Sequence, residues 1–80
     1  MKTPRDISGG QLATALGRLG YEITRQAGSH MRLTRREGGE HHITIPNHTR
    51  VKIGTLNSIL NEVAQHRGMS KDEILKSLFS

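Results

Sequence analysis

The stretch Gly28-Ser29-His30-Met31-Arg32-Leu33-Thr34 joins a turn of small residues to a run in which apolar and polar residues alternate. Successive side chains of a strand point to opposite faces of a sheet, so Met31 and Leu33 are expected on the buried face. The exposed face then carries His30, Arg32 and Thr34. Because Gly28 and Ser29 add little bulk beside the imidazole, a large ligand can approach the backbone and the ring together.

Two other segments alternate in the same way and predict a three-stranded antiparallel sheet over residues 21–26, 31–35 and 41–45. In the first and third segments, the side chains expected on the buried face are Tyr21, Ile23, Ile43 and Ile45. Those expected on the exposed face are Glu22, Thr24, Gln26, His42 and Thr44. Gly38 and Gly39 favour a hairpin, and Pro46 ends the last strand because it has no N–H to donate.

Two apolar stripes with the spacing i, i+3, i+4, i+7 predict amphipathic helices before and after the sheet. The stripes are Leu12, Ala15, Leu16, Leu19 and Leu56, Ile59, Leu60, Val63. Ser8 is expected to cap the first helix and Gly20 to end it, whereas Thr55 is expected to cap the second. Ser70 and Glu73 have capping-box spacing and predict a short third helix. The expected fold class is α+β.

The length of 80 residues predicts one domain over residues 1–80, with a small core. The net charge is +5, and eight of the twelve cationic side chains are arginines, which match phosphate well. This charge favours a nucleic-acid ligand, although small basic domains also bind acidic proteins. With Tyr21 and Phe79 as the two aromatic residues, a binding face of stacked aromatic rings is not expected.

The sequence also argues against several other classes of protein. It has no cysteine, hence no disulfide framework and no thiolate metal site. It has no apolar run of the ~20 residues that span a membrane, and no signal peptide is expected at its start. We therefore expect a cytoplasmic protein.

Five histidines raise the question of a metal site, but none is expected because zinc needs three or four converging ligands. His41 and His42 are adjacent on one strand and point to opposite faces. His66 is read as a charge at the C-terminal end of a helix, and His48 either contacts phosphate or is an ordinary loop residue. His30 differs by its position, although an exposed histidine on spacing alone is more often only exposed.

The start of the second predicted helix is a candidate seat for phosphate. A helix N-terminus offers free N–H groups and a positive potential, and Lys52 and Gly54 precede Thr55 here. Every capped helix has such a terminus, however, and most of them bind no anion.

Four short motifs, taken in order between residues 19 and 60, together resemble the HicA family of bacterial toxins. They are Leu19-Gly20-Tyr21, Gly28-Ser29-His30, Ile45-Pro46-Asn47-His48 and Gly54-Thr55-Leu56 followed by Ile59-Leu60. The resemblance implies a double-stranded-RNA-binding-like fold, metal-independent cleavage of mRNA and inhibition by a HicB-type antitoxin. It places the catalytic histidine at His30 and its supporting small residues at Gly28 and Ser29. The segment from Met69 to Ser80 is less diagnostic of the family, and the His41-His42 pair has no match in the family pattern.

The implied chemistry is physically coherent. A neutral imidazole can take a proton from a ribose 2′-OH, which then attacks the adjacent phosphate, so the reaction requires RNA but no metal or other cofactor. His42 is a candidate for the second group, which protonates the leaving 5′-oxygen. The residues expected to bind RNA are Gly28, Ser29, Arg32, Thr34, His42, His48, Arg50, Lys52 and Thr55. DNA is expected as a partner only through a toxin–antitoxin complex, if at all.

Two other functions remain open from the sequence. One is a non-catalytic module that binds double-stranded RNA through its backbone and 2′-OH groups, and the other is a small DNA-binding adaptor. Cleavage distinguishes the enzyme from the first, and a requirement for the 2′-OH distinguishes RNA from DNA.

Overall fold

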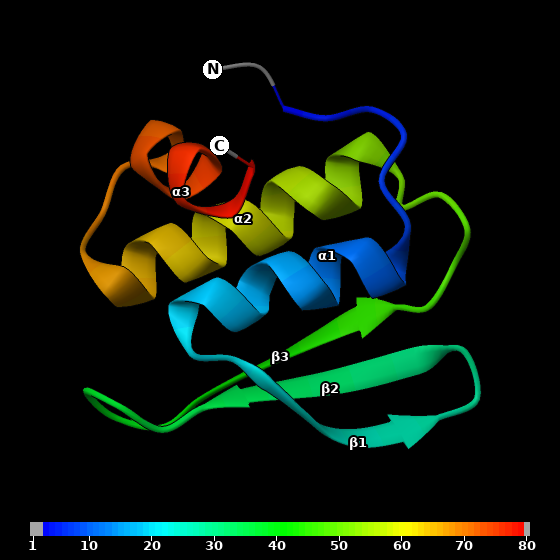
Figure 1. Ribbon diagram of the computed structural model, residues 1–80, viewed down its shortest axis with the longest axis horizontal. Helices are drawn as coiled ribbons and strands as arrows, with labels where there is room; N and C mark the ends of the chain where they lie inside the picture. Colours follow the sequence, from blue (N-terminus) through cyan, green and yellow to red (C-terminus); the bar gives the residue numbers. More distant parts are fainter. Residues whose placement is uncertain (1–2, 80) are drawn as a thin grey trace.

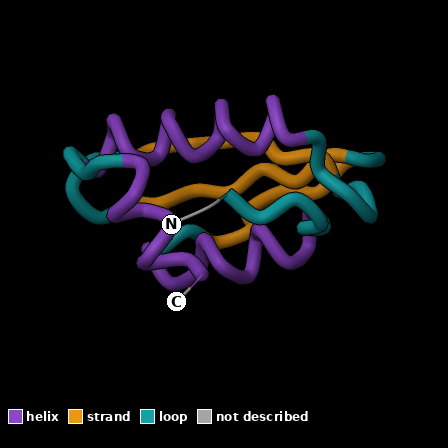
Figure 2. Tube along the Cα trace, turned by 90° about the horizontal axis from the view of Figure 1, so that it is seen from above, coloured by secondary structure: helices purple, strands orange, loops and turns teal. Residues whose placement is uncertain are grey.

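A three-stranded antiparallel sheet forms one layer of the computed structural model, which describes residues 3–79, and the helices lie above it (Figure 1). In chain order the elements are α1 (Gly9–Leu16), a 3₁₀ turn η1 (Gly17–Leu19), β1 (Glu22–Ala27), β2 (His30–Arg35), β3 (His41–Pro46), α2 (Ile53–Arg67) and α3 (Lys71–Phe79). Figure 2, which views the molecule from above, shows the strands running between α1 and α2. This is the double-stranded-RNA-binding-like α+β fold that the resemblance implied.

The three strands lie in the order β1-β2-β3. The buried face of the sheet is formed by side chains of β2 and β3. Met31 is paired with Ile45 and Leu33 with Ile43, and all four side chains are buried in the core. The alternation in the sequence therefore predicted the buried face of these two strands correctly. Their other face stays uncovered and presents His30 and the residues beside it to solvent.

The edge strand β1 departs from the prediction. Ile23 pairs with Leu33, but the next pair is Arg25 with Arg32, so Thr24 is an extra residue that forms a β-bulge. Beyond the bulge each side chain changes face, and Gln26, expected on the exposed face, instead shares the face of Met31. The expected burial of Ile23 is wrong as well, because at the sheet edge its side chain stays 51% exposed.

The helix ends follow the sequence signals with one exception. Ser8 and Gln11 form a reciprocal capping box at α1, and Gly20, with φ of 90°, ends η1 in the left-handed conformation. The prediction that Thr55 caps α2 is wrong, because the helix begins at Ile53 and Lys52 is its N-cap residue. Val51 is buried and its N–H donates to the Ile7 carbonyl oxygen at 2.8 Å, which fixes the chain early enough for the helix to start before Thr55.

The last helix, α3, completes the same hydrophobic core. Ser70 and Glu73 form the expected capping box at its start. Its three buried side chains are Ile74, Leu75 and Leu78, and they pack with the apolar stripes of α1 and α2. Within residues 3–79, none of the helices combines the length and apolar character needed to cross a membrane.

Candidate functional site

His30 is the first residue of β2 and follows the two-residue turn Gly28-Ser29. Gly28 has φ of 57°, and a Cβ built there meets no atom within 4 Å, so its backbone angle rather than its space calls for glycine. The Ser29 carbonyl oxygen accepts a hydrogen bond from the Asn47 N–H at 2.6 Å. This bond ties the turn before His30 to the loop that follows β3.

A pocket of about 390 Å³, here called the His30 pocket, opens where that turn, the end of β3 and the start of α2 meet. Its lining residues are His30, Thr44, Pro46, His48, Lys52 and Thr55. It therefore brings together His30, His48, Lys52 and Thr55, four of the residues expected to act in the site. Pro46 was not expected there, but it is the cross-strand partner of His30, which only the strand register reveals.

The loop that carries His48 is held tightly against the start of α1. The Gly9 N–H donates to the His48 carbonyl oxygen at 2.9 Å, and a Cβ on Gly9 would lie 2.1 Å from the Pro46 carbonyl oxygen. Only glycine allows the helix to come this close without moving the loop. The backbone under His48 is therefore fixed by the turn before β2 on one side and by α1 on the other.

A second hollow, of about 170 Å³, lies beside the first on the exposed face of the sheet. It is lined by Arg25, Ala27, His30, Arg32 and Thr44. Arg25 and Arg32 are cross-strand partners, an arrangement that disfavours folding unless an anion lies between them. Neither arginine has a carboxylate partner in the part of the chain that the structure describes.

The sequence did not predict Arg25 as a site residue, because regular alternation places it on the opposite face of the sheet from His30. The bulge at Thr24 places Arg25 on the same face as His30. Such a bulge cannot be predicted from the hydrophobic pattern of an exposed edge strand.

Two residues expected to bind RNA are engaged elsewhere. Thr34 is only 2% exposed, and its hydroxyl lies 2.8 Å from the Thr24 hydroxyl and 2.8 Å from His42 Nδ1. The other ring nitrogen of His42 lies 3.1 Å from a Glu40 carboxylate oxygen. His42 pairs with Thr34, four residues along β2 from His30, or about 13 Å away at ~3.3 Å per residue. The structure thus separates His42, the candidate general acid, from His30.

Arg50 also lies apart from the His30 pocket. Its guanidinium forms a salt bridge with Asp6, and it lines a different hollow together with Arg5, Val51, Lys52 and Ile53. Lys52 lines both hollows and is the cation of this loop that shares a pocket with His30.

A second group of titratable side chains lies at the far end of β3, on its helix-covered side. The Tyr21 hydroxyl lies 2.6 Å from His41 Nδ1, and His41 Nε2 lies 3.1 Å from a Glu62 carboxylate oxygen. The His66 ring stacks on His41 with centroids 4.1 Å apart. His66 lies in the last turn of α2, as expected, but burial lowers its pKa and the neighbouring His41 lowers it further. Burial also raises the pKa of Tyr21.

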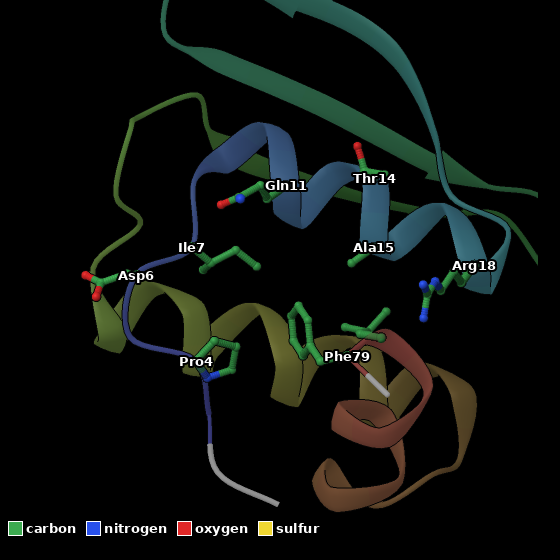
Figure 3. A pocket seen from close by; sticks show the side chains of 9 residues that line it. Pro4, Asp6, Ile7, Gln11, Thr14, Ala15, Arg18 and Phe79 are labelled. Carbon is green, nitrogen blue, oxygen red and sulfur yellow. The ribbon is translucent and has the colours of Figure 1, made fainter.

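Another pocket, of about 380 Å³, lies between the N-terminal segment, α1 and α3 (Figure 3). Its walls are Pro4, Asp6, Ile7, Gln11, Thr14, Ala15, Arg18, Leu78 and Phe79. The carboxylate of Asp6 pairs with Arg50, and no histidine lines this pocket. Among residues 3–79, no group of three or more His, Asp or Glu side chains is placed to hold a metal ion.

The geometry can be compared with known proteins. A family model described as the HicA toxin of bacterial toxin–antitoxin systems matches residues 9–64, a range that contains every residue of the His30 pocket. No curated protein and no solved structure gives a significant match. Because the family model covers more than half of the 80 residues, the chain belongs to the HicA family of bacterial toxins.

Proposed function

We propose that this toxin is an endoribonuclease that cleaves mRNA without a metal ion, with His30 as the general base. The observation that carries the proposal is the position of His30, which lines both the His30 pocket and the cationic hollow beside it. An RNA strand that crosses the exposed face of the sheet passes this imidazole. The Nε2 or Nδ1 atom then accepts the proton of a ribose 2′-OH as that oxygen attacks phosphorus.

Several cations surround the place where charge builds up on the phosphate. Lys52 lines the His30 pocket, and the first turn of α2 has no side-chain cap, so its N–H groups remain free for an anion. On the other side Arg32 and Arg25 line the adjoining hollow. Positive groups fixed in these positions stabilise the pentacoordinate phosphate without having to rearrange.

The substitution His30→Ala tests the proposal. Cleavage of RNA should fall by about 10²-fold or more, the usual contribution of a general base. Because the side chain is exposed, the free energy of unfolding should change by less than ~0.5 kcal/mol. RNA affinity should change little, since Arg32 and Lys52, the cations that neighbour His30 and are expected to bind phosphate, are retained. The matched control is His42→Ala, which removes another exposed histidine from the same face but outside the pocket and should retain cleavage.

The measurements are RNA cleavage, RNA affinity and thermal unfolding, made side by side for both variants and the wild type. An RNA and a DNA of the same sequence, each with and without EDTA, complete the set. RNA alone should be cut, and EDTA should have no effect. Full cleavage by the His30→Ala variant would remove this residue from the mechanism. Tight RNA binding without any cleavage by the wild type would instead favour a non-catalytic RNA-binding module.

Membership of the family implies an antitoxin partner. We propose a HicB-type antitoxin with an acidic surface that covers the His30 pocket, because complementary charge speeds association with a chain of net charge +5. Hydrogen exchange of the complex should show protection at the Gly28-Ser29 turn and in the loop of His48. Protection confined to α3, with His30 still open to RNA, would contradict direct occlusion.

A further inference from the structure

We infer that His48 is the second proton-transfer group of the site, the general acid that protonates the leaving 5′-oxygen. The inference rests on the proposed function and adds a residue to its mechanism. His30 removes the 2′-OH proton, the 2′-oxygen forms a bond to phosphorus, and the bond from phosphorus to the 5′-oxygen breaks. The proton of His48 goes to that oxygen, so the products are a 2′,3′-cyclic phosphate and a 5′-OH.

The first argument is proximity. His30 and His48 line the same pocket of about 390 Å³, although they come from different segments of the chain. Pro46 is the cross-strand partner of His30, and such partners have Cβ atoms only about 5 Å apart. His48 follows Pro46 by two residues, and the Asn47 N–H between them is bonded to the Ser29 carbonyl oxygen at 2.6 Å. The backbone segments that carry the two histidines are thus held together by strand pairing and by this hydrogen bond.

The second argument is rigidity. General acid–base catalysis needs its groups held in place, because a small displacement removes much of the rate. The loop of His48 is held by the Gly9 N–H on the His48 carbonyl oxygen and by the Val51 N–H on the Ile7 carbonyl oxygen. Gly9 allows α1 to approach the backbone of this loop closely, because a Cβ at that position would clash with it. An ordinary exposed loop would not require a glycine on the facing helix.

The third argument comes from the other titratable groups. Both ring nitrogens of His42 have partners outside the pocket, and His41 and His66 stack on each other at the far end of β3. Lys52 is the remaining titratable group that lines the His30 pocket, and its compact ammonium is suited to holding a phosphate as a point charge. Of the described side chains in the pocket, His48 is therefore the one suited to the role of acid.

The decisive experiment changes the leaving group of the substrate. The cleavage site is first mapped with wild-type protein, and an RNA is then made with sulfur in place of the bridging 5′-oxygen at that site. A thiolate leaves without being protonated, so this substrate does not need a general acid. Rates are measured on both substrates for the wild type, His48→Ala and His30→Ala. Thr49→Ala, an exposed loop neighbour outside the pocket, is the control and should behave as wild type.

His48→Ala should lose about 10²-fold or more on the oxygen substrate and stay within about tenfold of wild type on the sulfur substrate. His30→Ala should lose activity on both, since the 2′-OH must still be deprotonated.

Three results overturn the inference. Equal losses by His48→Ala on the two substrates would mean that His48 only binds RNA. Wild-type rates on both would mean that it is an ordinary loop residue, with the proposed function intact. If the wild type itself cleaves neither RNA, the proposed function fails, and the role of His48 fails with it. Thermal unfolding of each variant shows whether a loss reflects chemistry or folding.

Discussion

His66 has an environment that disfavours its protonated form. Its Nε2 atom is buried without a hydrogen-bond partner among the described residues, and its ring stacks on His41. Arg35 and Arg67 add positive charge nearby, and together with burial these neighbours lower the pKa of His66. The unfolded chain therefore binds this proton more tightly than the folded protein does.

This difference predicts how stability depends on pH. A base whose pKa is lower in the folded state stabilises the fold fully above its unfolded pKa of about 6.5, and the contribution is lost as the pH falls through the lower folded value. The free energy of unfolding should thus decrease as the pH falls through and below about 6.5, and His66→Gln should flatten this decrease.

Chemical denaturation at a series of pH values measures the effect. Gln65→Ala, an exposed and non-titrating neighbour on α2, should keep the wild-type dependence. If His66→Gln kept it too, the proton uptake on unfolding would have to come from another group.

At the scale of elements, the fold depends on how closely α1 approaches the loop between β3 and α2. Gly9 is buried at this crossing, and the Cβ of any other residue would lie 2.1 Å from the Pro46 carbonyl oxygen and 2.9 Å from the Asn47 Cα. These are backbone atoms, which cannot swing aside as a long side chain can. The same contact sets the position of His48, so helix packing and site geometry are coupled here.

Gly9→Ala should lower the free energy of unfolding by about 1–3 kcal/mol, the usual cost of overpacking. It should also reduce RNA cleavage, because the His48 loop must shift. Gly10→Ala is the matched control. Its Cβ would meet only the Ser8 hydroxyl at 4.0 Å, so the better helix propensity of alanine should stabilise the protein by about 0.5–1 kcal/mol. Similar effects of the two changes, measured by denaturant unfolding and cleavage rate, would contradict the close-approach argument.

The whole molecule separates its core from its charged surface. The helices cover one face of the sheet, as Figure 1 and Figure 2 show, and the other face carries Arg25, Arg32 and His30 in the open. A polyanion bound to that face displaces counterions, so RNA affinity should fall steeply with salt.

Arg32→Ala should reduce the slope of log affinity against log salt by about 0.7–1, the value of one phosphate contact. Lys76→Ala removes one positive charge as well, but from α3, where this side chain pairs with Asp72. It should leave the slope unchanged. The check is a titration of RNA binding at several salt concentrations, and equal slopes for the two variants would mean that net charge, and not the exposed face of the sheet, drives binding.

Most of the local structure follows from short-range patterns in the sequence. Alternation placed Met31, Leu33, Ile43 and Ile45 on the buried face, because strand side chains repeat every two residues whatever the rest of the chain does. The cap at Ser8 and the capping box of Ser70 and Glu73 were also predicted, since each involves residues close together in the sequence. The motifs also identified the family and singled out His30.

Long-range contacts, in contrast, determine which side chains share the pocket with His30. His48 and Lys52 reach it because the loop after β3 is bonded to the turn before β2, a contact between segments far apart in the sequence. His42 and Arg50 looked equally suitable in the sequence, but Glu40, Thr34 and Asp6 hold them elsewhere. The bulge that brings Arg25 to the exposed face also depends on pairing with β2. Short-range patterns fix faces and helix ends, whereas register and loop contacts, which depend on distant residues, fix the site.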